Sequence, residues 1–253
     1  MSERRARSAR RPGGARSQHF LRSQALAAEL VRDAGVGADD LVLDLGAGSG
    51  RLTAELARRA GRVVAVELDP RWAGELRRRW ENVEVVRGDA ASVSLPPEPF
   101  RVVANLPFDR TTAILRHLLD DPRVPLLRAD VIVEWNVAMK RALPWPSTFN
   151  DVAWGAWYSA AVTRRLTRSA FEPAPSVDAG VLVFERRASP LVPLELAEPY
   201  RRFVASGFRR RANARELDAY AWAELFRRRG GRAASGARLA RAARRPRPPR
   251  AGS

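Results

Sequence analysis

The chain has 253 residues, of which 45% are hydrophobic, so it can bury one α/β core and carry a small appendage. It contains no cysteine, which excludes disulfides, thiolate zinc sites and a cysteine nucleophile. No stretch approaches the roughly 18 apolar residues of a membrane span. The Arg-rich N-terminus is not followed by the apolar run of a signal peptide. We therefore expect a soluble, cytoplasmic monomer with no membrane partner.

The formal net charge of +17 is concentrated at the two ends of the chain. Residues 1–16 carry six Arg against Glu3, residues 227–253 carry ten Arg and no acid, and the intervening body is only +2. Arg guanidinium pairs with phosphate through a rigid fork of donors, so two Arg-rich arms favour a nucleic-acid partner. Lys140 is the only lysine, so a general preference for Arg contributes, but it does not explain the clustering at both ends.

Short β-rich runs alternate along the chain with helical patterns. The runs predict strands at Leu41–Leu45, Arg62–Leu68, Val83–Arg87, Arg101–Leu106 and Asp130–Trp135. Helices are predicted at Gln24–Ala34, Leu52–Ala60, Arg71–Trp80 and Thr111–Leu119. This alternation implies crossover connections and a parallel sheet covered on both faces. The predicted fold class is therefore α/β, doubly wound and Rossmann-like.

The pattern changes in the last third of the chain. Val181–Phe184 predicts a late strand, which the Pro-broken segment Phe171–Pro175 would return to the sheet in an antiparallel hairpin. Apolar residues at helical spacing then predict two helices, which carry Tyr200, Phe203, Val204 and Phe208, and Leu217, Ala221 and Leu225. We expect a disordered basic arm at 1–16, a catalytic domain at 17–188, a small helical RNA-binding domain at 189–229 and a disordered Arg-rich tail at 230–253.

A glycine-rich turn follows the first strand of the predicted sheet, with the sequence Asp44-Leu45-Gly46-Ala47-Gly48-Ser49-Gly50. Ligands of open α/β sheets bind at this carboxyl edge, where glycine lets the backbone approach them closely. Glu67 ends the second strand, 21 positions after Gly46, the spacing at which an acid accepts from ribose hydroxyls. Asp89 follows the third strand.

Two cofactors compete for this arrangement. A nicotinamide cofactor favours Gly-x-Gly-x-x-Gly, whereas the spacing here is Gly-x-Gly-x-Gly preceded by an acid. S-adenosyl-L-methionine has no pyrophosphate and carries a sulfonium and an ammonium, so a pocket with Asp44, Glu67 and Asp89 suits it better. Each acid alone would be read as a helix cap or a surface ion pair. The three together favour S-adenosylmethionine.

The fourth strand ends in Asn105-Leu106-Pro107-Phe108, which indicates the substrate chemistry. An exocyclic aromatic amine is a poor nucleophile, because its lone pair is delocalised into the ring. The Asn105 amide oxygen and the Leu106 carbonyl would each accept one amine hydrogen and direct that lone pair at a methyl group. Pro107 removes a competing donor, and Phe108 can stack on an extruded base. Without the glycine turn, the tetrapeptide would be read as a simple strand end.

These residues resemble the ribosomal RNA adenine N6-methyltransferases, which include the erythromycin-resistance (Erm) enzymes and the housekeeping KsgA-type enzymes of the small subunit. The resemblance runs from Gln18 to about Arg187 and implies a class I S-adenosylmethionine-dependent methyltransferase fold. Gln18-His19-Phe20-Leu21 is similar to the family's Gln-Asn-Phe-Leu cofactor motif, with His19 in place of Asn. By this resemblance the cofactor contacts are His19, Leu21, Asp44, Gly46, Gly48, Glu67, Asp89 and Asn105.

Phe171-Glu172-Pro173-Ala174-Pro175-Ser176-Val177 is similar to the family's Phe-x-Pro-x-Pro-x-Val motif, whose Phe is expected near the flipped adenine. Anchoring of a Pro-rich hairpin in the core is an equally good role for Phe171. The segment Glu134–Ala142 and the residues after Phe108 resemble actinomycete Erm enzymes. A buried packing role is favoured over RNA contact for the aromatic stretch with Trp154 and Trp157.

The resemblance implies methyl transfer to adenine N6 in 23S rRNA, with resistance to macrolides, lincosamides and streptogramin B. The nearest alternative is the housekeeping small-subunit enzyme. Another is a non-catalytic rRNA-binding assembly factor in which His19 has spoiled the cofactor pocket. A DNA adenine methyltransferase is more distant, because it more often carries Asp-Pro-Pro-Tyr than Asn-Leu-Pro-Phe. No metal site is expected.

Overall fold

The computed structural model describes residues 19–143, 148–210, 214 and 216–242, and it divides into two compact units. The first unit contains residues up to Ala142 together with Ser159–Arg186, and the second contains Leu143–Tyr158 together with the chain after Arg186. The predicted boundary near residue 188 is close to the second junction. Residues 143–158 were expected in the catalytic domain, but they belong to the second unit.

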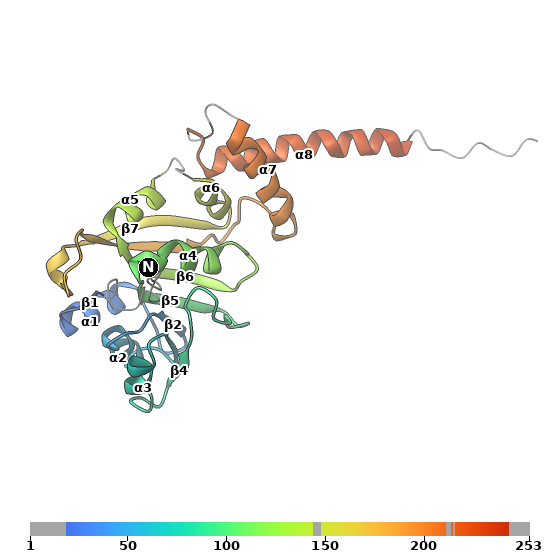
Figure 1. Ribbon diagram of the computed structural model, residues 1–253. Coiled ribbons are helices and arrows are strands. Elements are labelled where there is room, and N and C mark those ends of the chain that lie inside the picture. Colours follow the sequence, from blue (N-terminus) through green and yellow to red (C-terminus); the bar gives the residue numbers. More distant parts are fainter. Residues whose placement is uncertain (1–18, 144–147, 211–213, 215, 243–253) are drawn as a thin grey trace, which may run out of the picture. The chain divides into compact units, whose positions relative to one another are not determined.

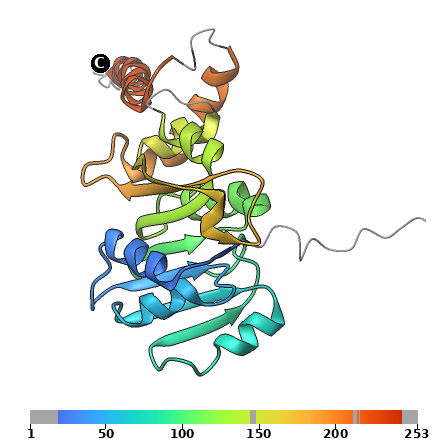
Figure 2. The ribbon, with the colours of Figure 1, turned by 90° about the vertical axis from the view of Figure 1, so that its left-hand side faces the viewer.

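The first unit is built on a seven-stranded sheet with the strand order β4-β3-β2-β5-β6-β9-β7 (Figure 1). The strands are β2 (Leu41–Leu45), β3 (Arg62–Glu67), β4 (Val83–Arg87), β5 (Phe100–Asn105), β6 (Leu126–Glu134), β7 (Tyr158–Leu166) and β9 (Ala179–Arg186). A separate pair joins β1 (Phe20–Leu21) to β8 (Phe171–Glu172). In Figure 2 the large sheet is seen from the side as one continuous stack of strands.

The strands β2 to β6 pair in parallel, and β9 returns antiparallel to β6. The predicted doubly wound sheet and its late antiparallel strand are therefore confirmed. The chain moves outward from β2 to β4 and then crosses back to β5 on the other side of β2. The carboxyl ends of β2 and β5 thus flank the topological switch point, where α/β sheets bind ligands.

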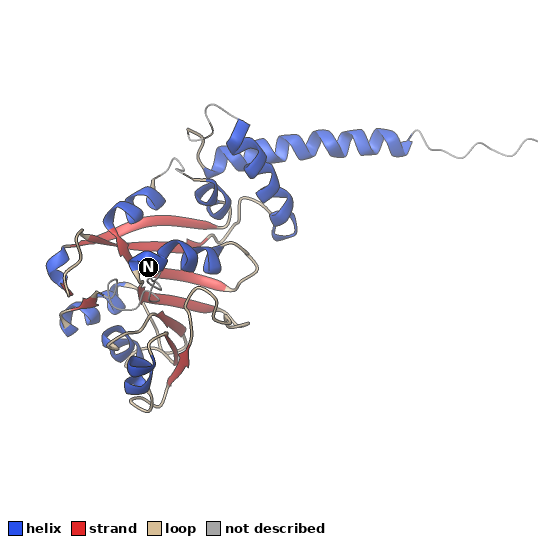
Figure 3. Ribbon diagram, viewed as in Figure 1, coloured by secondary structure: helices blue, strands red, loops and turns tan. Residues whose placement is uncertain are grey.

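Helices flank this sheet, shown in blue beside the red strands in Figure 3. They are α1 (Gln24–Asp33), α2 (Arg51–Ala57), α3 (Pro70–Leu76), α4 (Thr111–Leu119) and α5 (Trp135–Ala142). The helices α1 and α2 bury Leu30 and Leu56 in one cluster with Val42, Val63 and Val103 of the sheet. All five residues of β2 are buried, as expected of a central strand that is covered on both faces.

Predicted and observed elements agree closely in the first two-thirds of the chain, where β2, β4 and α4 have the predicted bounds. The prediction was wrong at Trp135, which begins α5 rather than ending a strand. It also missed β7, whose inner residues alternate between half-buried and exposed and include Arg164 and Arg165. Such a strand lacks the continuous apolar run of a central strand, because it lies at the edge of the sheet.

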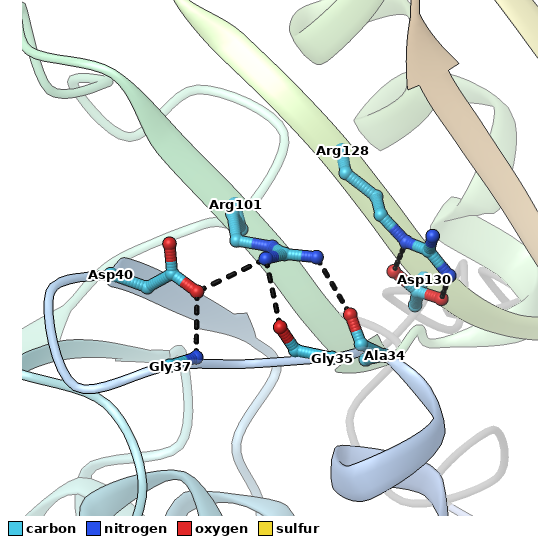
Figure 4. A network of polar contacts seen from close by, with 7 residues as sticks. All are labelled: Ala34, Gly35, Gly37, Asp40, Arg101, Arg128 and Asp130. Atoms are coloured by element: carbon cyan, nitrogen blue, oxygen red, sulfur yellow. Dashed lines mark hydrogen bonds and ion pairs between the residues drawn. The ribbon is translucent and has the colours of Figure 1, made fainter.

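The amino ends of β5 and β6 carry a network of paired charges (Figure 4). The Arg101 guanidinium donates to Asp40 Oδ2 at 3.1 Å and to the carbonyl oxygens of Gly35 at 3.0 Å and Ala34 at 2.7 Å. On the neighbouring strand, Arg128 donates to both carboxylate oxygens of Asp130 at 2.7 and 2.8 Å. The Arg101 contacts tie the end of α1 and the loop before β2 to the sheet, whereas the Arg128–Asp130 pair lies within β6.

The second unit has an aromatic core formed by α6 (Phe149–Gly155), α7 (Ala197–Arg210) and α8 (Ala219–Ala242). The ring of Tyr200 lies 5.7 Å from Trp157 and 5.3 Å from Phe226, centroid to centroid. Trp154 and Trp157 are buried, which confirms the packing role expected for them. No helix of the described residues, in either unit, is long and apolar enough to cross a membrane.

Helix α8 differs from the predicted tail, because it continues through residues 230–242, where the sequence analysis expected disorder. Ala and Arg rank among the strongest helix formers, and this segment is rich in both. The prediction gave too much weight to its glycines and its lack of large apolar residues. The predicted basic arm at 1–16, Gln18 and the rest of the tail at 243–253 lie outside the described residues.

Candidate functional site

The glycine turn after β2 lies directly against the turn after β5. Gly46 has a φ of +81° and Gly48 a φ of +51°, a left-handed conformation that favours glycine. A Cβ on Gly46 would lie 3.2 Å from Pro107 Cδ, and one on Gly48 would lie 2.5 Å from Phe20 Cε1. Glycine therefore allows two segments to close on this turn, the N-terminal motif and the Asn-Leu-Pro-Phe segment.

Glu67 fixes the shape of the same turn. Its carboxylate is buried, with Oε2 accepting from the Gly48 amide at 2.7 Å and Oε1 accepting from the Asp69 amide at 2.8 Å. The end of β3 is thereby joined to the glycine turn after β2. Each carboxylate oxygen still has a second lone pair for a hydroxyl donor.

A cavity of about 400 Å³ opens at this edge of the sheet, within the size range of small-molecule sites. It brings together nine of the predicted site residues, namely His19, Gly46, Gly48, Glu67, Asp89, Asn105, Leu106, Pro107 and Phe108. Three other predicted residues, Leu21, Asp44 and Phe171, do not line it. All the residues that line this cavity belong to the first unit.

Asp44 is buried beneath the turn instead of facing the cavity. Its Oδ2 accepts a hydrogen bond from the Thr53 hydroxyl at 2.6 Å. Burial raises the pKa of Asp44 to about 7; the hydrogen bond from Thr53 opposes the rise, and the charge of Glu67 adds to it. The contact with Thr53 links the end of β2 to α2, so the structure gives Asp44 a supporting position.

Asn105 has a fixed orientation in the cavity wall. Its side-chain Nδ2 donates to the His19 carbonyl oxygen at 2.6 Å, and its Oδ1 is buried without a hydrogen-bond partner. A carbonyl can only accept, so this bond determines which end of the amide is which. The Pro107 carbonyl accepts from the Arg110 amide at 2.9 Å and closes the following turn. One strong acceptor, Asn105 Oδ1, is therefore left for a ligand.

Phe108 is held between two other rings. Its centroid lies 5.5 Å from the His19 ring and 6.4 Å from Phe171, which meets it edge to face. The His19 ring nitrogen Nδ1 lies 2.8 Å from the Pro173 carbonyl oxygen, and Phe171 is fully buried. Of the two roles open to Phe171 on sequence grounds, the structure favours core packing, with its edge supporting Phe108.

Ten of the 19 residues that line the cavity were not predicted as site residues, and Phe20 and Arg110 are two of them. Phe20 lines the cavity and packs edge to face on Trp72, with the centroids 5.2 Å apart. Arg110 also lines it and is paired with the Asp89 carboxylate. Phe20 lies inside the motif that was recognised, so its position there was the available signal. No local sequence pattern predicts that Arg110 pairs with Asp89, which lies 21 residues earlier.

The doubly wound sheet with a glycine turn and a cavity at its switch point defines a Rossmann-like methyltransferase fold. A crystal structure of the 23S rRNA methyltransferase ErmE matches with a TM-score of 0.71 and 28% identity, covering 83% of this chain and 98% of that one. The chain belongs to the ribosomal RNA adenine dimethylase family, whose model matches residues 15–218.

Two curated relatives illustrate the range of this family. The mycinamicin-resistance protein MyrB of Micromonospora griseorubida is 36% identical over 170 residues, 62% of this chain and 54% of that protein. The ribosomal RNA small subunit methyltransferase A of Streptomyces avermitilis is 33% identical over 195 residues, 72% of this chain and 65% of that protein. The chain spans a little over half the length of the first curated relatives it matches.

Proposed function

We propose that this chain transfers methyl from S-adenosylmethionine to N6 of an adenine in 23S rRNA, and thereby protects the ribosome from macrolides, lincosamides and streptogramin B. Membership of the rRNA adenine dimethylase family supports the reaction. The match to ErmE over nearly all of that structure, and the resemblance to a mycinamicin-resistance protein, support the large-subunit target and the resistance role. The proposed location is the cytoplasm, and the proposed state is a monomer.

The buried, unpartnered Oδ1 of Asn105 is the observation that carries this proposal. An acceptor removed from water without a partner costs about 1–3 kcal/mol, so a ligand that donates to it gains that energy. An adenine N6 amine has two hydrogens, and Oδ1 can accept one of them. The Leu106 carbonyl, in the same cavity wall, is the proposed acceptor for the other. One N6 hydrogen is then replaced by methyl and leaves as a proton.

The residues at the other end of the cavity suit the proposed donor. S-adenosylmethionine supplies an electrophilic methyl group when bound. Glu67 is held by the Gly48 and Asp69 amides, so it can accept ribose hydroxyls without moving. Gly46 and Gly48 let Pro107 and Phe20 pack closely on the turn, and Asp89, which is paired with Arg110, also lines the wall. An acidic wall within a basic chain favours a cationic donor over a nucleotide phosphate.

Phe108 is the proposed platform for the extruded adenine. Extraction of a base costs a few kcal/mol, and one base–aromatic stack returns about 1–3 kcal/mol. The buried edge of Phe171 and the His19 ring restrict the movement of the Phe108 ring, so little side-chain entropy remains to be lost on stacking. The helical second unit and the Arg-rich ends are proposed to hold the RNA backbone.

The direct test is primer-extension mapping of total rRNA from cells that express the gene, combined with mass spectrometry of the modified nucleoside. We expect one strong stop at an adenine of 23S rRNA and recovery of N6-methylated adenosine from it. Cells that express the Asn105→Ala, Phe108→Ala double variant serve as the matched control and should lack the stop. Normal modification by this double variant would exclude the proposed site.

The second candidate is methylation of the small subunit, which the 33% identity to the Streptomyces avermitilis enzyme favours. Tritiated donor supplied with either protein-free 23S rRNA or immature small subunits separates the two. Label confined to the small subunits would reverse the choice. Calorimetry with S-adenosylmethionine tests a non-catalytic assembly role, because no binding at high micromolar donor would support it.

A further inference from the structure

A second cavity of about 450 Å³ adjoins the glycine turn. Gly46 and Gly48 line the donor cavity, whereas Ser49 and Gly50 line this one. The first residues of α1 and α2, Gln24 and Arg51, form part of its wall, and Arg79 and Trp80, which follow α3, complete it. All of these residues belong to the first unit. We refer to this cavity as the arginine groove.

The arginine groove is lined by two positive charges and by no carboxylate among its described residues. Arg51 and Arg79 form no ion pair within the described part of the chain. Other arginines there, such as Arg58, Arg62, Arg101 and Arg165, are paired with acids. The Arg51 Nε atom is buried and has no hydrogen-bond partner. A buried cationic donor without a partner is costly, and an anionic ligand in the groove would lower that cost.

Glu55, which lies four residues after Arg51 on α2, is already engaged by other partners. Glu55 of α2 accepts from Gln24 Nε2 at 2.5 Å, from Arg58 Nη1 at 2.5 Å and from Arg59 Nη1 at 3.5 Å. Gln24 Nε2 also donates to the Arg51 carbonyl oxygen at 3.1 Å, so the Gln24 amide nitrogen joins the first residue of α2 to Glu55. The positive charge of the groove is therefore left uncompensated.

Trp80 gives the groove a fixed wall. It packs on the small core cluster of Ala47, Ala65 and Leu76, and the Arg79 guanidinium carbon lies 5.5 Å from the centroid of its ring. A guanidinium stacked on an indole keeps its edge free for hydrogen bonds, because the stack uses only its face. Arg79 is thus partly oriented before any ligand arrives.

We propose that the arginine groove binds a backbone phosphate of the RNA substrate, outside the site of the target base. This inference rests on the proposed function, because it takes the methylated substrate to be RNA. Arg binds phosphate through paired N–H donors, and the groove provides one guanidinium from each of two segments. Because Ser49 and Gly50 of the glycine turn line the groove, a phosphate bound there would anchor the RNA close to that turn.

The test compares two double variants that each remove two positive charges. Arg51→Gln with Arg79→Gln alters the groove, whereas Arg62→Gln with Arg123→Gln alters two exposed arginines that are paired with acids elsewhere. RNA affinity is measured by fluorescence anisotropy from low to high salt. We expect the groove variant to bind RNA more weakly. The slope of log affinity against log salt concentration should become shallower by about 0.7 to 0.9, which corresponds to the loss of one phosphate contact. The control should keep the wild-type slope.

Three results would overturn the proposal. The first is equal slopes in the two double variants when thermal unfolding shows both to be folded. The second is a loss of donor affinity in the groove variant, measured by calorimetry, which would assign the arginines to the donor site. The third is binding of inorganic phosphate to wild type with RNA affinity unchanged in the groove variant, which would indicate a site for free anions only. Adenine methylation by the wild type is measured separately. A result that contradicts the groove proposal can therefore be distinguished from one that contradicts the proposed function.

Discussion

The two edges of the central sheet differ in how their polar groups are satisfied. At the amino edge, Arg101 bonds to Asp40 and to two carbonyl oxygens, and Arg128 is paired with Asp130. At the carboxyl edge, the Asn105 Oδ1 has no partner, and the turn contains glycines whose Cβ would meet a neighbour. The charges of the amino edge are paired within the chain, although Arg101 Nε has no partner, whereas the carboxyl edge leaves a buried acceptor of Asn105, a residue of the cavity wall, without a partner.

This difference teaches where to expect stability and where to expect function. Buried polar groups are normally paired, because an unpaired one costs free energy. An edge whose charged groups are paired with one another can therefore be altered only at the expense of folding. An edge with an open acceptor already carries that cost, which a ligand can remove. Mutations at the two edges should accordingly separate into effects on unfolding and effects on catalysis.

The largest expected effect is at Asn105. Asn105→Ala removes the proposed acceptor of the N6 hydrogen, and we expect kcat to fall by about 100-fold or more, as for loss of one hydrogen bond made to a transition state. Asn105→Asp keeps an acceptor but loses the donor to the His19 carbonyl, so its kcat should lie between those of the alanine variant and the wild type. Single-turnover methyl transfer measures both. A loss smaller than about tenfold in Asn105→Ala would contradict this role.

The next effect is at Phe108, on the same edge. Phe108→Ala removes a stack worth about 1–3 kcal/mol, so kcat/KM for RNA should fall by about 5- to 150-fold. Donor affinity, measured by calorimetry, should change little. Phe108→Trp keeps an aromatic face and is the matched control. Equal activity of the alanine and tryptophan variants would exclude base stacking at this position.

At the amino edge, we expect Arg101→Ala to affect folding and not chemistry. The change leaves Asp40 and the carbonyls of Ala34 and Gly35 without a charged donor, which should lower the free energy of unfolding by about 2 kcal/mol. Urea unfolding measures this loss. Arg123→Ala, in an exposed pair, should cost less than about 0.5 kcal/mol. A large fall in methyl transfer per folded molecule would contradict the separation of the two edges.

The remaining prediction concerns pH and tests the support beneath the cavity. Burial raises the pKa of Asp44 from 3.8 to about 7. The folded state therefore binds a proton more tightly than the unfolded state, and Asp44 makes stability fall as pH rises from about 4 to 7, by up to about 1.4 kcal/mol per pH unit. Above that range its contribution is constant. Asp44→Asn should remove this component, seen as a flatter pH dependence of unfolding than in wild type.

The local elements of the first unit were predictable because their signals are local. Val83–Arg87 and Thr111–Leu119 appear with the predicted bounds, since apolar periodicity and flanking Gly or Pro act over a few residues. The glycine turn and Asn105–Phe108 were predicted to share one edge, because parallel strands end together. The cavity contains both.

The remaining features depend on segments that are distant in sequence, and only the tertiary structure decided them. The hydrogen bond from Asn105 Nδ2 to the His19 carbonyl joins residues 86 positions apart. It orients the amide so that Oδ1 remains without a partner. Packing also places Asp44 and Phe171 outside the cavity lining. It forms the arginine groove from the first residues of α1 and α2 and the residues that follow α3. Sequence determined which chemical groups reach the sheet edge, whereas packing determined which of them found partners and which remained available.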